Sequence, residues 1–225
     1  MWQLLVPLVM MAGEYAYHRW IDPPAAMAPP KPQALQIAQT DEGVPIPYCY
    51  GTIRVDNPIT IWVGNGSAVD GTPFGVPFLY GIDLLWVIAV PPYNTPSFIK
   101  RIWWGGTIVD AFDGEHGLFG PGTISSFTVS SGADGVGPFG QIEFYDGSPT
   151  QNLGDPSTLA YQMMARSGAD MTLCPGYRNQ IVVALSLSPT PALGTYGAYL
   201  GAVPQIPQIS FEVVCANDTN DPSGP

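Results

Sequence analysis

The stretch Glu42-Gly-Val-Pro-Ile-Pro-Tyr-Cys-Tyr-Gly-Thr-Ile-Arg-Val55 decides the fold class of this chain. It places prolines ahead of a run in which apolar and polar residues alternate, which is the pattern of a strand with one buried face. A second stretch, Gln205-Ile-Pro-Gln-Ile-Ser-Phe-Glu-Val-Val214, repeats this pattern near the other end. Almost no helical periodicity lies between them. We therefore predict a mainly β protein, built from barrel-like or sandwich-like domains with long loops.

Working outward from these stretches, the branched and aromatic runs predict further strands, separated by glycine-rich and proline-rich turns. Residues 78–90 form the most apolar run and predict one strand buried on both faces. Gly105-Gly106 predicts a hairpin turn, and residues 64–76 predict a glycine-rich loop. The expected strands are residues 46–55, 59–63, 78–90, 99–104, 107–109, 124–129, 141–145, 177–187 and 206–215, with 33–39 as a weaker candidate.

Two segments are expected to be helical. Residues 155–168 combine a capping Asp155, helix formers and a closing Gly168. Residues 7–20 predict an N-terminal helix with one apolar side, whose apolar beginning is too short to span a membrane and lacks the basic start of a signal peptide. We divide the chain into an N-terminal helical arm and Pro-rich linker (1–32), a β-rich body (33–215) and a flexible tail (216–225). The arm either docks on a neighbouring subunit or packs on its own body.

The composition points to an assembly component. Hydrophobic residues make up 46% of the 225 residues and charged residues only 11%, where about 25% is usual. Such a shortfall predicts that much of the surface meets another subunit, although a large core with an uncharged polar exterior gives the same composition. The net charge is −11 with only seven scattered Lys and Arg residues, which excludes the basic stripe of a nucleic-acid-binding protein.

The three cysteines have no metal-binding spacing. Cys49, Cys174 and Cys215 are odd in number, so they do not form a complete internal disulfide framework. They predict small buried apolar side chains, with a zinc or iron–sulfur site completed by a fourth ligand as the alternative.

Candidate catalytic residues are few. His18 and His116 are the only histidines, and Asp110, Asp113 and Glu115 cluster around the second of them. These carboxylates fit a cation site or a pair of catalytic carboxylates, but a solvated turn is the commoner use of such a cluster. The sequence has no nucleophile elbow, P-loop or dinucleotide fingerprint. We therefore predict no enzyme activity, no catalytic residue, no metal site and no cofactor.

Tryptophan supports one alternative function. Trp62, Trp86, Trp103 and Trp104 are able to stack on sugars, and adjacency in a strand places the rings of Trp103 and Trp104 on opposite faces. One ring of that pair is expected in the core and the other at a ligand or subunit contact. The alternative is therefore a carbohydrate-binding or carbohydrate-active β domain.

Four stretches of the chain carry motifs that occur together, in this order, in one known family. The first is residues 42–55 with Ile59-Thr-Ile-Trp62, and the second is residues 84–104. The third is Ile142-Glu-Phe-Tyr-Asp-Gly-Ser-Pro-Thr-Gln151, similar to the family pattern Y-x-G-x-x-x-Q. The fourth runs from Tyr177-Arg-Asn-Gln-Ile-Val-Val183 to residues 206–213. Together these stretches cover residues 40–215, and on them the chain resembles the tail-tip hub proteins of long-tailed bacteriophages and gene transfer agents.

This resemblance implies a structural virion protein at the tail tip, made in the host cytoplasm. It implies a trimer that closes the tail tube and contacts the distal tail protein, other hub proteins, the central fibre and the tape measure protein. No direct nucleic-acid binding and no stable membrane insertion are expected. Family members are longer, so receptor binding is not implied here, and Asn179 replaces the glycine that the family has in its Tyr-Arg-Gly turn.

Overall fold

The computed structural model describes residues 45–64, 66–70, 78–93, 95–109, 120–129, 138–170, 174–187 and 206–215. All of these residues lie in one compact unit, Lys31–Pro225. The predicted N-terminal arm, the candidate strand at 33–39 and the tail at 216–225 fall outside the described residues. The three-part division of the chain therefore stays a prediction.

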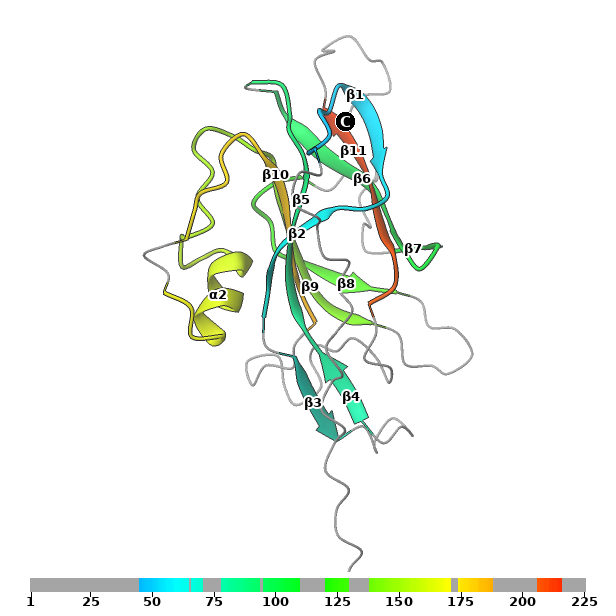
Figure 1. The fold of residues 1–225 in the computed structure, drawn as a ribbon, viewed down its shortest axis with the longest axis vertical. Coiled ribbons are helices and arrows are strands. Elements are labelled where there is room, and N and C mark those ends of the chain that lie inside the picture. Colours follow the sequence, from blue (N-terminus) through cyan, green and yellow to red (C-terminus); the bar gives the residue numbers. More distant parts are fainter. Residues whose placement is uncertain are drawn as a thin grey trace, which may run out of the picture. The chain divides into compact units, whose positions relative to one another are not determined.

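The described part is a set of antiparallel sheets with one helix, α2, at Leu159–Arg166 (Figure 1). This confirms the mainly β prediction, in its sandwich form. One sheet has four strands in the order β1-β11-β6-β7, a second has five in the order β2-β5-β10-β9-β8, and β3 pairs with β4. The strands are β1 Gly51–Val55, β2 Ile59–Val63, β3 Ser67–Asp70, β4 Phe78–Gly81, β5 Asp83–Ala89, β6 Ser97–Trp104, β7 Thr107–Ile108, β8 Ser125–Thr128, β9 Phe139–Tyr145, β10 Ile181–Ser186 and β11 Ile209–Cys215.

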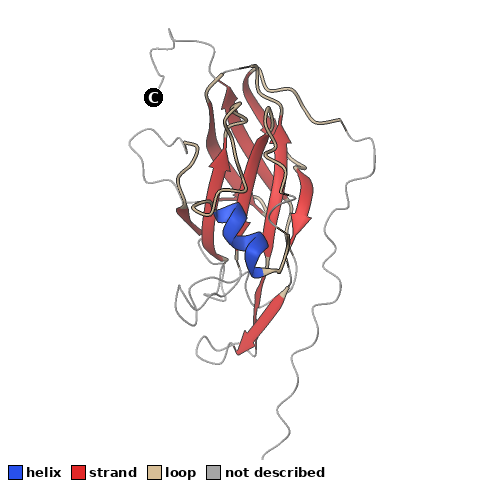
Figure 2. Ribbon diagram, turned by 90° about the vertical axis from the view of Figure 1, so that its left-hand side faces the viewer, coloured by secondary structure: helices blue, strands red, loops and turns tan. Residues whose placement is uncertain are grey.

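The five-stranded sheet is the middle of three layers. One of its faces packs against the four-stranded sheet through a core that contains Trp86, Phe144 and Phe211. Its other face packs against α2 through a second core that contains Leu85, Leu159 and Met163. Figure 2 shows α2 lying in front of the strands. Because β5 and β10 are central strands, every residue in both is buried, which explains why they are apolar apart from Asp83 and Ser186 at their paired ends.

The apolar run at 78–90 was predicted as one strand, and its burial is confirmed. It is divided at Ile82, however, into β4 and β5, which belong to different sheets. The predicted loop at 64–76 is also wrong in part, because β3 lies within it and pairs with β4. The alternation in Ser67-Ala-Val-Asp70 is too short to distinguish from a loop by composition.

Several predicted elements begin later than expected, among them β11, which starts at Ile209 and not at residue 206. Pro45 and Pro47 have no N–H for a sheet, so β1 starts only at Gly51, after Tyr48 has made an isolated parallel bridge to Val90. β10 starts at Ile181 because the residues before it form a turn with positive φ angles.

Helix α2 starts at Leu159 because Thr158, and not Asp155, caps it. Thr158 Oγ1 accepts from the Tyr161 N–H at 3.2 Å, whereas Asp155 Oδ1 accepts from the Ser157 N–H at 2.9 Å and forms a turn. The predicted hairpin at Gly105-Gly106 is confirmed. Gly105 and Gly106 join β6 to β7 with φ angles of +57° and +87°, which glycine adopts readily.

Among the described residues, no helix has the length and apolar character needed to cross a membrane.

Candidate functional site

The third and fourth family-like stretches meet at the side chain of Gln151. Its Oε1 accepts from the Gly147 N–H at 2.7 Å, while its Nε2 lies within hydrogen-bonding distance of three carbonyl oxygens. Those carbonyls belong to Gly176, Tyr177 and Gln180, at 3.3, 2.9 and 3.3 Å. Through these hydrogen bonds the single amide of Gln151 joins the turn after β9 to the turn before β10. The Gln151 side chain is buried, which shields the bonds from water.

The two turns also contact each other through their backbones. The Asn179 N–H donates to the Gly147 carbonyl at 2.9 Å. Asn179 has a φ of +61°, a conformation that asparagine tolerates better than most residues, so it fits the position where the family has glycine. Gly147 has a φ of +81°, and a Cβ there would lie 2.8 Å from Pro91 Cγ. Asp146 closes the turn after β9, since its Oδ1 accepts from the Ser148 N–H at 2.9 Å.

A buried carboxyl group holds the N-terminus of α2. Glu143 Oε2 accepts from the Leu159 N–H at 2.6 Å and from the Tyr145 hydroxyl, and that hydroxyl accepts from the Ala160 N–H at 3.2 Å. Burial raises the pKa of Glu143, and the hydrogen bonds from Tyr145 and Leu159 oppose the shift. Burial and the neighbouring Glu143 also raise the pKa of Tyr145. The pair therefore satisfies two helix N–H groups that would otherwise have no partner.

An acidic polar cleft of about 710 Å³ opens beside this pair, on the helix side of the five-stranded sheet. Two further carboxylates, Asp146 and Asp155, line it. The hydroxyl and N–H of Ser157 lower the pKa of Asp155, so this carboxylate is anionic at neutral pH. No Lys or Arg is among the lining residues, which are Pro121, Gly122, Thr123, Ile124, Glu143, Tyr145, Asp146, Ser148, Thr150, Gln151, Asn152, Asp155, Ser157 and Thr158. We call this surface the acidic cleft.

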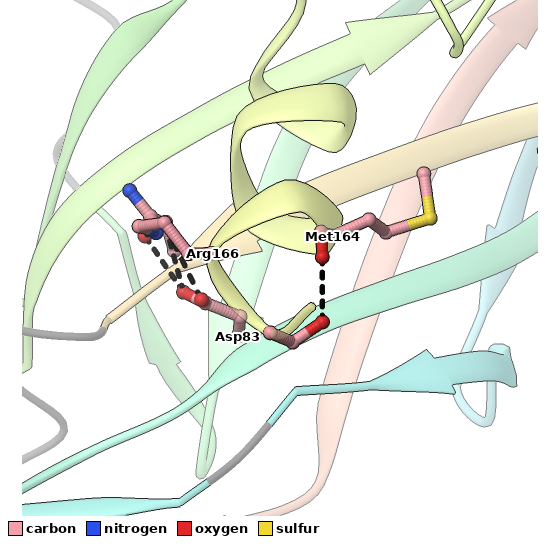
Figure 3. A network of polar contacts seen from close by, with 5 residues as sticks. Asp83, Met164 and Arg166 are labelled. Atoms are coloured by element: carbon pink, nitrogen blue, oxygen red, sulfur yellow. Dashed lines mark hydrogen bonds and ion pairs between the residues drawn. The ribbon is translucent and has the colours of Figure 1, made fainter. Parts of the chain in front are cut away.

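The other end of α2 is held by an ion pair (Figure 3). Arg166 Nη2 lies 3.3 and 3.2 Å from the two carboxylate oxygens of Asp83 and 2.9 Å from Ser186 Oγ. Ser186 donates in turn to Asp83 at 2.8 Å. Because Asp83 is buried on β5, Arg166 compensates a carboxylate that would be costly alone. Both ends of the helix are therefore fastened to the sheet by polar side chains.

A third cluster of polar side chains lies on the outer face of the four-stranded sheet. Arg54 of β1 and Arg101 of β6 flank Glu212 of β11 in the strand register. A β-bulge in β6 places Lys100 beside Arg101, so Glu212 faces both cations at 3.7 and 3.6 Å. The Arg54 guanidinium lies 4.2 Å above the Trp103 ring.

We call this surface the Arg54–Trp103 face. It consists of Arg54, Phe98, Lys100, Arg101, Trp103, Ile108, Glu212 and Val214, which the strand register places on the side of the sheet away from the core.

The tryptophans only partly fit the sugar-binding alternative. Trp86 and Trp104 are buried in the main core, so neither is available to a ligand, and Trp86 is wrong as a candidate for sugar stacking. The split of the adjacent pair is confirmed, because Trp104 is in the core while Trp103 is half-buried on the outer face. Trp62 is half-buried against the second core.

The predicted acidic and histidine candidates lie outside the described residues. These are His18, Asp110, Asp113, Glu115 and His116. Among the residues that the structure describes, no group of three or more His, Cys, Asp or Glu side chains is placed to hold a metal ion.

The cysteines differ from the prediction. Cys49 and Cys215 form a disulfide, with Cα atoms 6.1 Å apart, and both are buried. Cys174 is free and half-buried. The cysteine count agrees with one unpaired thiol, but the sequence reasoning missed the pairing. The alternative of three thiolates in one metal site is wrong, because two of the sulfurs are bonded to each other.

Sequence reasoning missed the ties made by Glu143, Gln151 and Arg166. The family-like pattern contained Gln151 as its last letter, but a pattern does not say which carbonyls an amide reaches. Glu143 carried a local signal, since it lies between the apolar Ile142 and Phe144, and a carboxyl group that is buried in a strand needs a partner.

Comparison with known proteins gives one structural likeness. No protein-family model matches the chain, and no curated protein matches it. The fold is similar to part of a solved chain from the "Virion of native gene transfer agent (GTA) particle", with a TM-score of 0.41 and 20% sequence identity. The match covers 81% of this chain and 29% of that chain. At this TM-score nothing is transferred from that particle to the present chain.

Proposed function

We propose that this chain is a structural virion protein of a phage-like tail tip, without catalytic activity. One observation carries the proposal: side chains and backbone groups of the family-like stretches hold one stretch against another. Gln151 and Gly147 of the third stretch bond the turn of the fourth, and Arg54 of the first covers Trp103 of the second. Residues used in this way maintain a rigid body, which is what a hub component requires.

The proposed place of the protein is the baseplate hub, as a trimer that closes the tail tube. It would join the distal tail protein and other hub proteins to the central fibre, near the tape measure protein. Two features support an assembly role. Only 11% of the residues are charged, and the Arg54–Trp103 face combines arginine with half-buried aromatic rings, as protein interfaces do. The net charge of −11 also suits a wall past which DNA moves without binding.

The direct test is to locate the chain in purified particles. Mass spectrometry of particles and gold-labelled antibodies viewed by electron microscopy should place it at the tail tip only. Label along the tail or on the head, or particles that lack the chain, would contradict the proposal.

Deletion of residues 1–32 tests the proposed role of the N-terminal arm. Particles should fail to assemble while the isolated body keeps its β circular dichroism spectrum. Deletion of residues 216–225 is the matched control and should leave assembly intact. Normal particles from the gene lacking residues 1–32 would refute a role for the arm.

A further inference from the structure

The described body carries two surfaces of opposite character on opposite sides. The acidic cleft lies on the helix side of the five-stranded sheet, and the Arg54–Trp103 face is the outer side of the four-stranded sheet. The main core separates the two sheets, and Figure 1 shows α2 and β11 on opposite sides of it. One molecule therefore cannot bring its own two surfaces together.

The Arg54–Trp103 face has the composition of an interface. It gathers three of the seven Lys and Arg residues of a chain whose net charge is −11. The side chains of Arg54, Lys100 and Arg101 are 51, 44 and 53% exposed. Trp103, Phe98 and Val214 are half-buried between them, and Ile108 is 50% exposed. Arginine and large apolar side chains in one patch are typical of the centre of a protein–protein contact.

Lys100 and Arg101 on this face are able to form an ion pair with a further carboxylate. Lys100 and Arg101 share the single carboxylate of Glu212, and both contacts are long, at 3.7 and 3.6 Å. Lys100 and Arg101 are about half exposed, whereas the Glu212 side chain is only 16% exposed. One cation is therefore able to turn to a new partner while the other still compensates the charge of Glu212. Asp56 neutralises Arg54, which leaves one positive charge in excess over the two carboxylates.

We propose that the Arg54–Trp103 face of one copy binds the acidic cleft of the next copy, in a head-to-tail contact. Two molecules of charge −11 repel each other in most orientations. The orientation that sets Arg101 and Lys100 against Asp146 and Asp155 is attractive, so electrostatics selects it. Because the two surfaces differ and lie on opposite sides, the contact is heterologous, and repeated copies close into a ring or extend as a filament. This inference rests on the proposed hub function only for the expectation that the ring closes at three.

Charge reversal tests the contact. The full-length protein should associate in sedimentation equilibrium at about 0.1 M salt, where charges more than about 10 Å apart are screened, so the repulsion between the net charges is weakened while close charge pairs still act. Arg101→Glu and Asp155→Lys should each weaken association about tenfold or more. The double variant should recover at least part of it, because its new glutamate meets the new lysine of the neighbouring copy.

A control variant separates a specific contact from the effect of net charge. Arg178→Glu changes the charge by the same amount as Arg101→Glu, at an exposed position that belongs to neither surface. It should leave association unchanged, and circular dichroism should show that every variant is folded.

Three outcomes would overturn the inference: a monomer at every concentration, a wild-type oligomer that neither reversal weakens, or a double variant weaker than both single variants. Each of these leaves the proposed function to be decided separately by the position of the chain in particles.

Discussion

Reduction of the Cys49–Cys215 disulfide is expected to lower the free energy of unfolding by about 5 kcal/mol. The bond joins residues 166 positions apart, so it closes a loop that contains nearly the whole described body. The chain-entropy relation gives about 17 cal/mol/K for a loop of this length, or about 5 kcal/mol at 25 °C. For a domain of this size that loss corresponds to a melting temperature lower by about 10–20 °C.

Reduction is a cleaner perturbation than mutation, because both sulfur atoms remain in the core. Cys49 and Cys215 are fully buried, so alanine at either position would add the cost of a cavity. Urea unfolding followed by tryptophan fluorescence, with and without a strong reductant, measures the difference directly. Cys174→Ala is the control, since this free thiol takes no part in the disulfide and the variant should keep the full response to reductant.

The reasoning would be refuted if oxidised and reduced protein unfolded at the same urea concentration. It would also be refuted if reduction changed the stability of a Cys49→Ala/Cys215→Ala double variant by as much as that of the wild type. In the first case the bond would not constrain the unfolded chain, and in the second the reductant would act elsewhere.

The remaining predictions concern the ties at the acidic cleft. Burial raises the pKa of Glu143 above its ordinary value of 4.5, so the folded state holds this proton more tightly than the unfolded state. The stability that protonation contributes is therefore present below pH 4.5 and is lost as the pH rises through the raised pKa. Glu143→Gln should remove this part of the pH dependence when the two proteins are unfolded with urea over a range of pH. If the free energies of unfolding of the variant and the wild type depended on pH in the same way, the prediction would be disproved. Gln151→Ala should cost about 2–4 kcal/mol by chemical denaturation, because buried donors and acceptors lose their partners, whereas the exposed Gln162→Ala should change stability by less than about 0.5 kcal/mol. Gly147→Ala should destabilise more than Gly51→Ala, because both have positive φ angles but only the first would place a Cβ against other atoms; equal melting temperatures would contradict this.

The sequence predicted the strands well where local chemistry determines them. Alternation and branched side chains located β2 and β11, and paired glycines located the β6–β7 hairpin, because these signals act over a few residues. Errors gathered where neighbours far along the chain decide the outcome. Ile82 looks like a continuous part of an apolar strand, yet the chain changes sheets there. No local pattern marks that change.

The candidate site was less predictable for the same reason. Gln151 bonds carbonyls at 176–180, and Glu143 bonds an N–H group at Leu159, so both depend on the turns and the helix being in place. The disulfide joins the two ends of the described body, and cysteine spacing alone does not report such a pairing. The Arg54–Trp103 face required the register of β1, β11 and β6 before its members became neighbours.

The disulfide also determines how the protein responds to mechanical load. Cys49 lies just before β1 and Cys215 is the last residue of β11, so the chain enters and leaves the described body at one covalent link. A pulling force applied through the flanking segments passes from sulfur to sulfur and bypasses the hydrogen bonds of every strand between them. A sandwich connected in this way does not unravel under tension, whereas the reduced protein would have to resist the same pull with β1 and β11 alone.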